Sequence, residues 1–209
     1  MAIYSLTSYS MSSYPVPRII ENVVPSLERR SWMDLLGDIV KIVIIAAALI
    51  VPIRLFLVQP FFVKGSSMEP TLKENDYLLV DELSYRFRQP ERGEVVVFRY
   101  AQEDKKYFIK RVIGVPGETV DIHDNTITIV NKEHPDGFVL NEPYLPDYNL
   151  PDVAHAILGQ NEYYVLGDNR PVSYDSKRFG PVNIDHIVGR AVFRGFPLQK
   201  ATIIHTPTY

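Results

Sequence analysis

The stretch Lys64-Gly65-Ser66-Ser67-Met68-Glu69-Pro70-Thr71-Leu72 divides the chain into two parts with different patterns. A long apolar run ends just before it, and short runs typical of β-strands follow it. Gly65 lets the backbone approach another chain closely, and Pro70 restricts the backbone and favours a bend. A serine in such a bend can present its hydroxyl as a nucleophile. The same residues also suit a serine-rich turn that caps a helix or strand, so the stretch alone leaves both interpretations open.

Residues 39–63 are almost wholly apolar, with Lys41 near the start and Arg54 as an interruption. About twenty such residues span a bilayer as a helix, and the two cations are long enough to reach the interface. A buried core helix is the alternative, but no other helical pattern in the chain could surround it. We therefore expect a single transmembrane helix over 39–59, in contact with the lipid bilayer and preceded by a tail over 1–38.

After the serine-rich stretch, short runs rich in β-branched and aromatic residues are bounded by polar residues, Gly or Pro. The turn residues Asp124 and Asn125 predict a hairpin between two of these runs. We expect a mainly β fold, in which a twisted, partly closed β domain over 60–209 follows the single N-terminal helix. The predicted strands are 77–80, 94–100, 107–113, 119–122, 126–130, 162–166 and 187–193.

The composition excludes several kinds of site. A net charge of -3 argues against nucleic acid as a partner. The absence of cysteine excludes disulfides, thiolate metal ligands and a cysteine nucleophile. The five histidines are scattered without the spacing of a zinc site, so no metal site is predicted. No G-x-S-x-G surrounds Ser66 or Ser67, so a serine nucleophile here needs a base other than the histidine of that motif.

Lys110 is the candidate base, because it lies within an apolar predicted strand. A lysine on the core face of a strand loses hydration, which lowers its pKa from about 10.4 toward neutrality. A neutral amine can accept the proton of a serine, and Ser-Lys pairs are a known variant of the catalytic triad. In the alternative interpretation Lys110 points outward and Arg111 is structural, and the strand pattern does not decide between the two. The polar loop 167–180 is either an ordinary surface loop or a set of groups that orients the lysine.

Five segments, taken in order, resemble the motifs of type I signal peptidases, membrane-anchored serine proteases that remove signal peptides from exported proteins. The resemblance covers the chain from about residue 39 to 194, and its five motifs occur in the family's order behind the apolar run. The matching segments are Ser67–Leu72, Arg92–Phe98, Lys110–Glu118, Asn141–Tyr144, and Gly167–Arg170 with Ser173, Asp175 and Ser176.

The resemblance implies that Ser67, and not Ser66, is the nucleophile, and that Lys110 is the general base. Gly65 and Ser67 match the positions that bind the oxyanion, and some family members carry a serine where Gly65 stands. The family needs no metal or cofactor. The supporting positions are Ser173, which matches a serine that hydrogen-bonds the lysine, Asp175, which matches a bracing carboxylate, and Lys177, Asp168 and Asn169. The residues that match walls of the substrate pockets are Phe61, Val63, Met68, Leu72, Phe108 and Ile109.

Lys177 occupies a position that is often arginine in the family, which bears on the ion pair expected with Asp175. The resemblance also implies that preprotein signal peptides are the substrates. It places the chain in the plasma membrane by a single span, with a cytoplasmic tail (1–38) and an extracytoplasmic catalytic domain (60–209). Two rival interpretations are a self-cleaving repressor with a Ser-Lys pair and a non-catalytic, membrane-tethered β module that binds peptides by strand addition.

Overall fold

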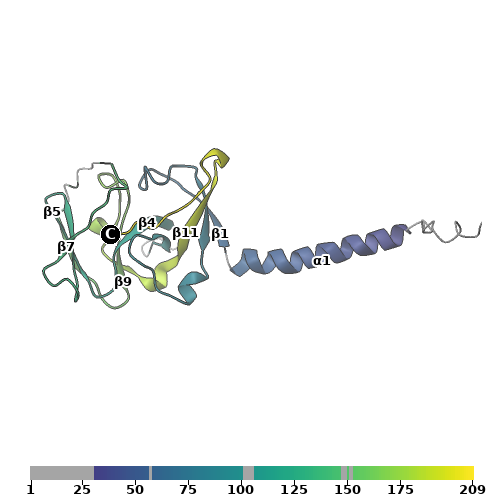
Figure 1. Ribbon diagram of the computed structural model, residues 1–209, viewed down its shortest axis with the longest axis horizontal. Helices are drawn as coiled ribbons and strands as arrows, with labels where there is room; N and C mark the ends of the chain where they lie inside the picture. The colour runs from purple at the N-terminus through teal and green to yellow at the C-terminus, as the bar shows by residue number, and fades with distance from the viewer. Residues whose placement is uncertain (1–30, 57, 101–105, 147–149, 151–152) are drawn as a thin grey trace, which may run out of the picture. The chain divides into compact units, whose positions relative to one another are not determined.

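Figure 1 shows the chain as a computed structural model, which describes residues 31–56, 58–100, 106–146, 150 and 153–209. Most of the predicted tail, residues 1–30, lies outside the described residues. The chain divides into two compact units, Met1–Ala46 and Ala47–Tyr209. The boundary falls within the first helix, and every strand of the described residues belongs to the second unit.

The first helix, α1 (Trp32–Phe56), is 25 residues long and exposes many of its large apolar side chains, such as Ile42 and Val43. It therefore begins before the predicted span 39–59 begins, and it ends at Phe56, before that span ends. Strand β1 (Val58–Phe62) starts within the predicted span, where Pro60 has no N–H with which to continue a helix. Taking the described residues alone, none of the helices combines the length and the hydropathy that a membrane span requires.

The larger sheet has eight strands, and all of its pairings are antiparallel. Its order is β1-β2-β11-β3-β4-β9-β10, with β12 paired to β11. The bounds are β1 (Val58–Phe62), β2 (Tyr77–Asp81), β3 (Val95–Arg99), β4 (Tyr107–Gly114), β9 (Glu162–Leu166), β10 (Val182–Asn183), β11 (Ile187–Phe196) and β12 (Thr202–Ile203).

The smaller sheet has four antiparallel strands in the order β7-β6-β5-β8 (Figure 1). Asp124 and Asn125 both have positive φ, as a tight hairpin turn requires, so the predicted hairpin is confirmed. The bounds are β5 (Thr119–His123), β6 (Thr126–Val130), β7 (Phe138–Val139) and β8 (Ala154–Ile157). The remaining helices are short: α2 (Ser176–Phe179), η2 (Ser84–Arg86), η3 (Ile184–His186) and η4 (Leu198–Lys200).

The mainly β prediction and all seven predicted strands are confirmed, with bounds shifted by a few residues at most. In the described chain the main path of strands is open in both sheets, with β12 paired to β11 beside that path, so the predicted partial closure is not observed. The sequence analysis missed five short strands: β1, β7, β8, β10 and β12. Strand β1 lies in the apolar run that was assigned largely to the predicted span, and the other four have four residues or fewer, too few for a clear alternating pattern to separate them from loops.

Strand β3 and the neighbouring part of β4 are buried on both faces. Val95 belongs to one apolar cluster, whereas Val96 and Phe98 belong to another. A third cluster fills the space beneath the smaller sheet and includes Ile113 at the end of β4. Because both sides of the strand are covered, even the charged side chains of β4 lie in the interior.

Candidate active site

The serine-rich stretch is fixed to the domain on both sides of Ser67. The amide of Val63 donates to Asp76 O (2.9 Å), and the amide of Asn75 donates to Val63 O (2.9 Å). Met68 and Leu72 are fully buried in the cluster that contains Val63. The apolar side chains thus anchor the bend, while Ser67 between them remains partly exposed.

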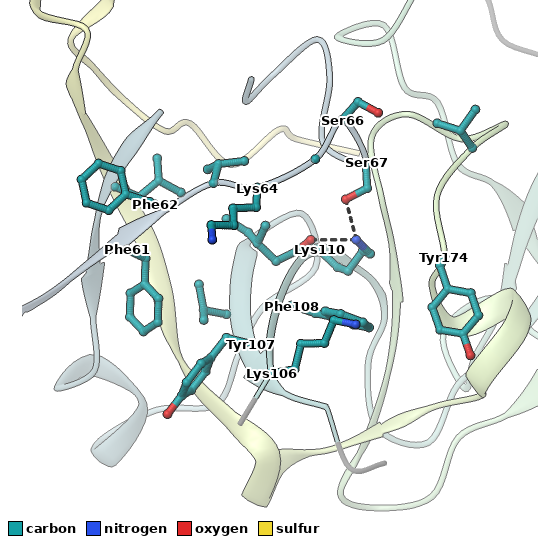
Figure 2. A pocket seen from close by; sticks show the side chains of 16 residues that line it. Phe61, Phe62, Lys64, Ser66, Ser67, Lys106, Tyr107, Phe108, Lys110 and Tyr174 are labelled. Atoms are coloured by element: carbon teal, nitrogen blue, oxygen red, sulfur yellow. Dashed lines mark hydrogen bonds between the residues drawn. The ribbon is translucent and has the colours of Figure 1, made fainter. Parts of the chain in front are cut away.

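Ser67 and Lys110 lie in direct contact, although 43 positions separate them in the chain. Lys110 Nζ is 2.7 Å from Ser67 Oγ and 3.1 Å from Ile109 O (Figure 2). Lys110 sits on β4, opposite Val96 of β3, and its side chain is only 4% exposed. The sheet therefore places the Lys110 amine next to the Ser67 hydroxyl, on the side of the protein interior.

The environment of Lys110 disfavours its charged form. Burial lowers the pKa of Lys110 from 10.5 to about 8, although the carboxylates of Asp175 and Asp168 pull it upward. The ammonium of Lys177 adds to the lowering. A substantial neutral fraction near pH 8 gives the amine the lone pair that a proton acceptor needs.

Arg111 points to the opposite face of β4, as neighbouring strand residues must. It is fully buried and bonds Asp168 with two contacts, Nε to Oδ1 (2.8 Å) and Nη2 to Oδ2 (2.6 Å). Its third nitrogen donates to Gly93 O (2.7 Å), and its guanidinium lies over the Tyr144 ring. Both interpretations of this strand therefore hold in part: Lys110 is buried beside the serine, and Arg111 is structural.

The polar loop after β9 contacts the serine-rich stretch. The backbone amide of Asn169 donates to Ser67 O (3.0 Å), and its side-chain amide donates to Ser66 O (3.1 Å). Asp175 is fully buried and accepts from the Gly167 amide (3.0 Å). The loop is therefore a structural partner of the bend that carries Ser67, not an ordinary surface loop.

The expected ion pair between Lys177 and Asp175 is present, with Lys177 Nζ 3.2 Å from Asp175 Oδ2. The expected hydrogen bond between Ser173 and Lys110 is absent. Ser173 is buried, and its Oγ has no hydrogen-bond partner within the described part of the chain. Its hydroxyl instead packs against Gly167, where a Cβ would collide with it.

An open cavity of about 660 Å³ lies next to the Ser67–Lys110 contact (Figure 2). Four of the six predicted pocket residues line it: Phe61, Val63, Phe108 and Ile109. Met68 and Leu72 do not, because their side chains turn into the core and hold the bend in place. The other lining residues were not predicted, and Ser66 had been compared with Ser67 only as a nucleophile and set aside. These residues are Phe62, Lys64, Ser66, Leu78, Val97, Lys106, Tyr107, Val172 and Tyr174.

One of the missed residues carried a usable signal, because Lys64 opens the serine-rich stretch that contains Ser67. Others, such as Val172 and Tyr174, reach the cavity only through the fold of the polar loop, which no local pattern encodes. Within the described residues, no group of three or more His, Asp or Glu side chains is arranged to hold a metal ion.

The geometry is suited to nucleophilic attack by Ser67 on a group bound in the cavity, with Lys110 as proton acceptor. Ser67 is partly exposed, its carbonyl is fixed by Asn169, and Lys110 Nζ is within hydrogen-bond reach of its hydroxyl. Within the described part of the chain, the Ser67 amide makes no backbone hydrogen bond. It is therefore available to a ligand oxygen.

The family model "Signal peptidase, peptidase S26" matches residues 36–196 of this chain. A probable signal peptidase I-2 from Synechocystis is 34% identical over 196 residues, which cover 88% of this chain and 85% of the relative. A signal peptidase IB from Staphylococcus aureus is 37% identical over 164 residues, covering 69% of this chain and 81% of the relative. A crystal structure of a signal peptidase I from Enterococcus faecalis aligns over 49% of this chain and 97% of that chain, at 30% identity and a TM-score of 0.42.

Proposed function

Because this chain belongs to the peptidase S26 family of signal peptidases and is a serine endopeptidase of the type I class, we propose that it removes signal peptides from exported preproteins with a Ser67–Lys110 dyad. The observation that carries the proposal is the 2.7 Å contact between Lys110 Nζ and Ser67 Oγ at the edge of a cavity. The apolar lining of that cavity suits the side chains of an extended peptide.

In the proposed reaction, neutral Lys110 takes the proton of Ser67 Oγ as the oxygen attacks the scissile carbonyl. The resulting ammonium returns that proton to the leaving amine, and the C–N bond breaks. A water molecule then attacks the acyl-enzyme, with Lys110 again accepting a proton and passing it back to Ser67. The Ser67 amide donates to the oxyanion, since Gly65 has no hydroxyl to offer.

The substrate lies extended beside the segment from Phe61 to Lys64 and pairs with its backbone. Phe61 and Phe108 belong to the cavity wall, and we expect these bulky rings to favour small side chains at the residue before the cut. Small or aliphatic side chains fit two positions earlier. Replacing the small residue before the cut with Phe or Lys is therefore expected to abolish processing.

We further propose that α1 anchors the enzyme in the plasma membrane as a single span, with the β domain on the extracytoplasmic side. Support comes from the apolar run of 39–63 and from the exposed apolar side chains of α1, such as Ile44 and Ile45. Protease added to intact spheroplasts is expected to digest the β domain. Protection of that domain until the membrane is opened would refute this orientation.

The proposed function is tested with purified protein and a preprotein that carries a small residue before its signal-peptide junction. The native protein is expected to release a shortened product, and Ser67→Ala and Lys110→Met are each expected to reduce the rate by at least about a thousandfold. The double variant is expected to be little worse than either, because the two side chains act as a unit. A membrane-tethered peptide-binding module, the alternative function, would bind the preprotein without shortening it.

A further inference from the structure

The cavity beside Ser67 has an unusual charge. Three of its lining residues are lysines, and among the described residues none of the lining side chains is a carboxylate. The chain as a whole has the opposite bias, with 25 acidic residues against 22 Lys and Arg. The surplus of positive charge is therefore a local property of the cavity and not a reflection of the composition.

Lys64 is the lysine best placed to meet a bound peptide. It lies three positions before Ser67, at the end of the segment along which the substrate is proposed to run. Its side chain borders the cavity, and Figure 2 shows its amine on the same side as Phe61 and Phe62. Lys64 is exposed, and no acidic side chain of the described residues forms a salt bridge with it.

The other two lysines differ in their surroundings. Lys106 borders the cavity just before β4, with its amine 5.6 Å from the centre of the Phe108 ring. Lys110 is buried and committed to Ser67. Lys64 is thus the charge that a substrate side chain in the cavity can approach without disturbing the proposed dyad, and Lys106 also borders the cavity.

We propose that Lys64, assisted by Lys106, makes the cavity select substrates that carry an acidic side chain close to the scissile bond. This inference rests on the proposed function, since it assigns a charge preference to the same peptide-binding cavity. A carboxylate beside two ammonium groups and several aromatic rings experiences less water than it does in solution, which strengthens the attraction. A lysine side chain of the substrate at the same place is repelled.

An anionic lipid headgroup is the other class of ligand that two lysines suit. The position of both side chains on the wall of the cavity favours the peptide, because a headgroup binds an outward-facing surface. Peptide selectivity and vesicle binding, measured on the same variants, distinguish an acidic peptide side chain from an anionic lipid headgroup.

The experiment uses the full-length protein in detergent and a series of peptides with a small residue before the cut. Each position flanking the cut carries Glu, Gln or Lys in turn, and kcat/KM is measured for every peptide. At one position or more, the native protein is expected to cleave the Glu peptide roughly fivefold faster than the Gln peptide, as expected for a partly exposed ion pair. Lys64→Gln is expected to remove most of that ratio, and Lys64→Glu to invert it in favour of the Lys peptide.

Lys132→Gln is the matched control, because Lys132 is exposed but does not border the cavity. The ratio of kcat/KM between the Glu and Gln peptides is expected to be the same in this variant as in the native protein. Binding of the same peptides to the Ser67→Ala variant gives a second readout that needs no cleavage.

Cleavage without a Glu preference at any position overturns the inference but leaves the proposed function standing. Tighter binding of Glu peptides that depends on Lys64, without cleavage by the native protein, supports the inference and refutes the function. Weaker binding of Lys64→Gln to phosphatidylglycerol vesicles, with an unchanged peptide ratio, also overturns the inference.

Discussion

The backbone amide of Asn169 donates a 3.0 Å hydrogen bond to the carbonyl oxygen of Ser67. This bond ties the loop after β9 to the bend that carries the proposed nucleophile, although 102 positions separate the two residues. The position of Ser67 therefore depends on the packing of that loop as much as on its own turn. Gly167 and Asp168 lie at the start of this loop and hold it in place.

Gly167→Ala is expected to reduce kcat strongly while the fold persists. A Cβ at this position would collide with Ser67 O and with Ser173 Oγ, and would lie 2.7 Å from Ser173 Cβ. Because Ser67 O is a backbone atom, no side-chain rotation can relieve this collision. The loop and the bend must therefore separate, which moves Ser67 relative to Lys110. A loss of about a hundredfold is reasonable for a displacement near 1 Å. Gly195→Ala is the control, because its Cβ would meet only ordinary contacts, the nearest at 3.5 Å. Equal activity of the two variants would contradict the prediction.

Asp168→Asn is expected to destabilise the domain by about 3–5 kcal/mol, because it leaves the buried guanidinium of Arg111 without its counter-charge. The two hydrogen bonds between these side chains, at 2.6 and 2.8 Å, are fully desolvated. The free energy of unfolding is measured by urea denaturation. The control is Asp121→Asn, which breaks a solvent-exposed contact with His155 and is expected to cost less than about 1 kcal/mol.

The sequence predicted the parts of this protein that local patterns encode. Short apolar runs placed seven of the strands, and the Asp124-Asn125 turn placed a hairpin. The pattern around Lys110 left open whether the lysine is buried, because burial on both faces of β4 erases the alternation that distinguishes inside from outside. It also did not give the partner of the lysine. The family resemblance supplied Ser67 as that partner, and the structure brings the two side chains into contact.

Other features could not be predicted because they depend on contacts between distant segments. Met68 and Leu72 were expected in the pocket wall, but both side chains pack into the core and anchor the bend. Tyr174 reaches the cavity from the polar loop, and its hydroxyl meets that of Tyr100 at 3.0 Å. No spacing within either segment indicates that contact, since the two residues lie 74 positions apart.

Substitutions at Gly65 are expected to lower activity, Gly65→Ser included, even though the family resemblance implies that a serine hydroxyl can occupy this position. Gly65 has φ +84°, a conformation that L-residues with a Cβ rarely adopt. Space is not the obstacle, because no atom lies within 4 Å of the position that a Cβ would take. The expected order of kcat/KM is Gly65, then Gly65→Asn, then Gly65→Ala and Gly65→Ser, since Asn tolerates positive φ better than the other two. A Gly65→Ser variant more active than the native enzyme would contradict this reasoning.

The activity of the native enzyme is expected to rise with pH, with a midpoint near 8 in kcat/KM. Burial lowers the pKa of Lys110 to about 8, and only the neutral amine can accept the proton of Ser67. Roughly a tenth of the amine is then neutral at pH 7, and most of it at pH 9. Lys177→Ala removes a positive charge that helps to lower this pKa, so the midpoint is expected to move upward in that variant. An unchanged midpoint in Lys177→Ala, or a native midpoint near 10, would show that another group controls the rate.

Lys110→Met is expected to be inactive and yet more stable than the native protein at pH 7. A pKa lowered from 10.5 to about 8 means that the folded protein penalises the charged lysine, by at most about 3 kcal/mol. The penalty is fully present below pH 8, where the lysine is charged in both states. It fades as the pH rises from 8 to 10.5, because only the unfolded chain still binds the proton there.

Met fills a similar apolar volume without that penalty, so the stability difference between Lys110→Met and the native protein is expected to be largest at pH 7 and to shrink toward pH 10. Urea denaturation at both pH values measures it, with the exposed Lys132→Met as control. If Lys110→Met is less stable than the native protein at pH 7, burial of the charged amine does not destabilise the folded protein. The role of Lys110 as a neutral base then loses its physical support.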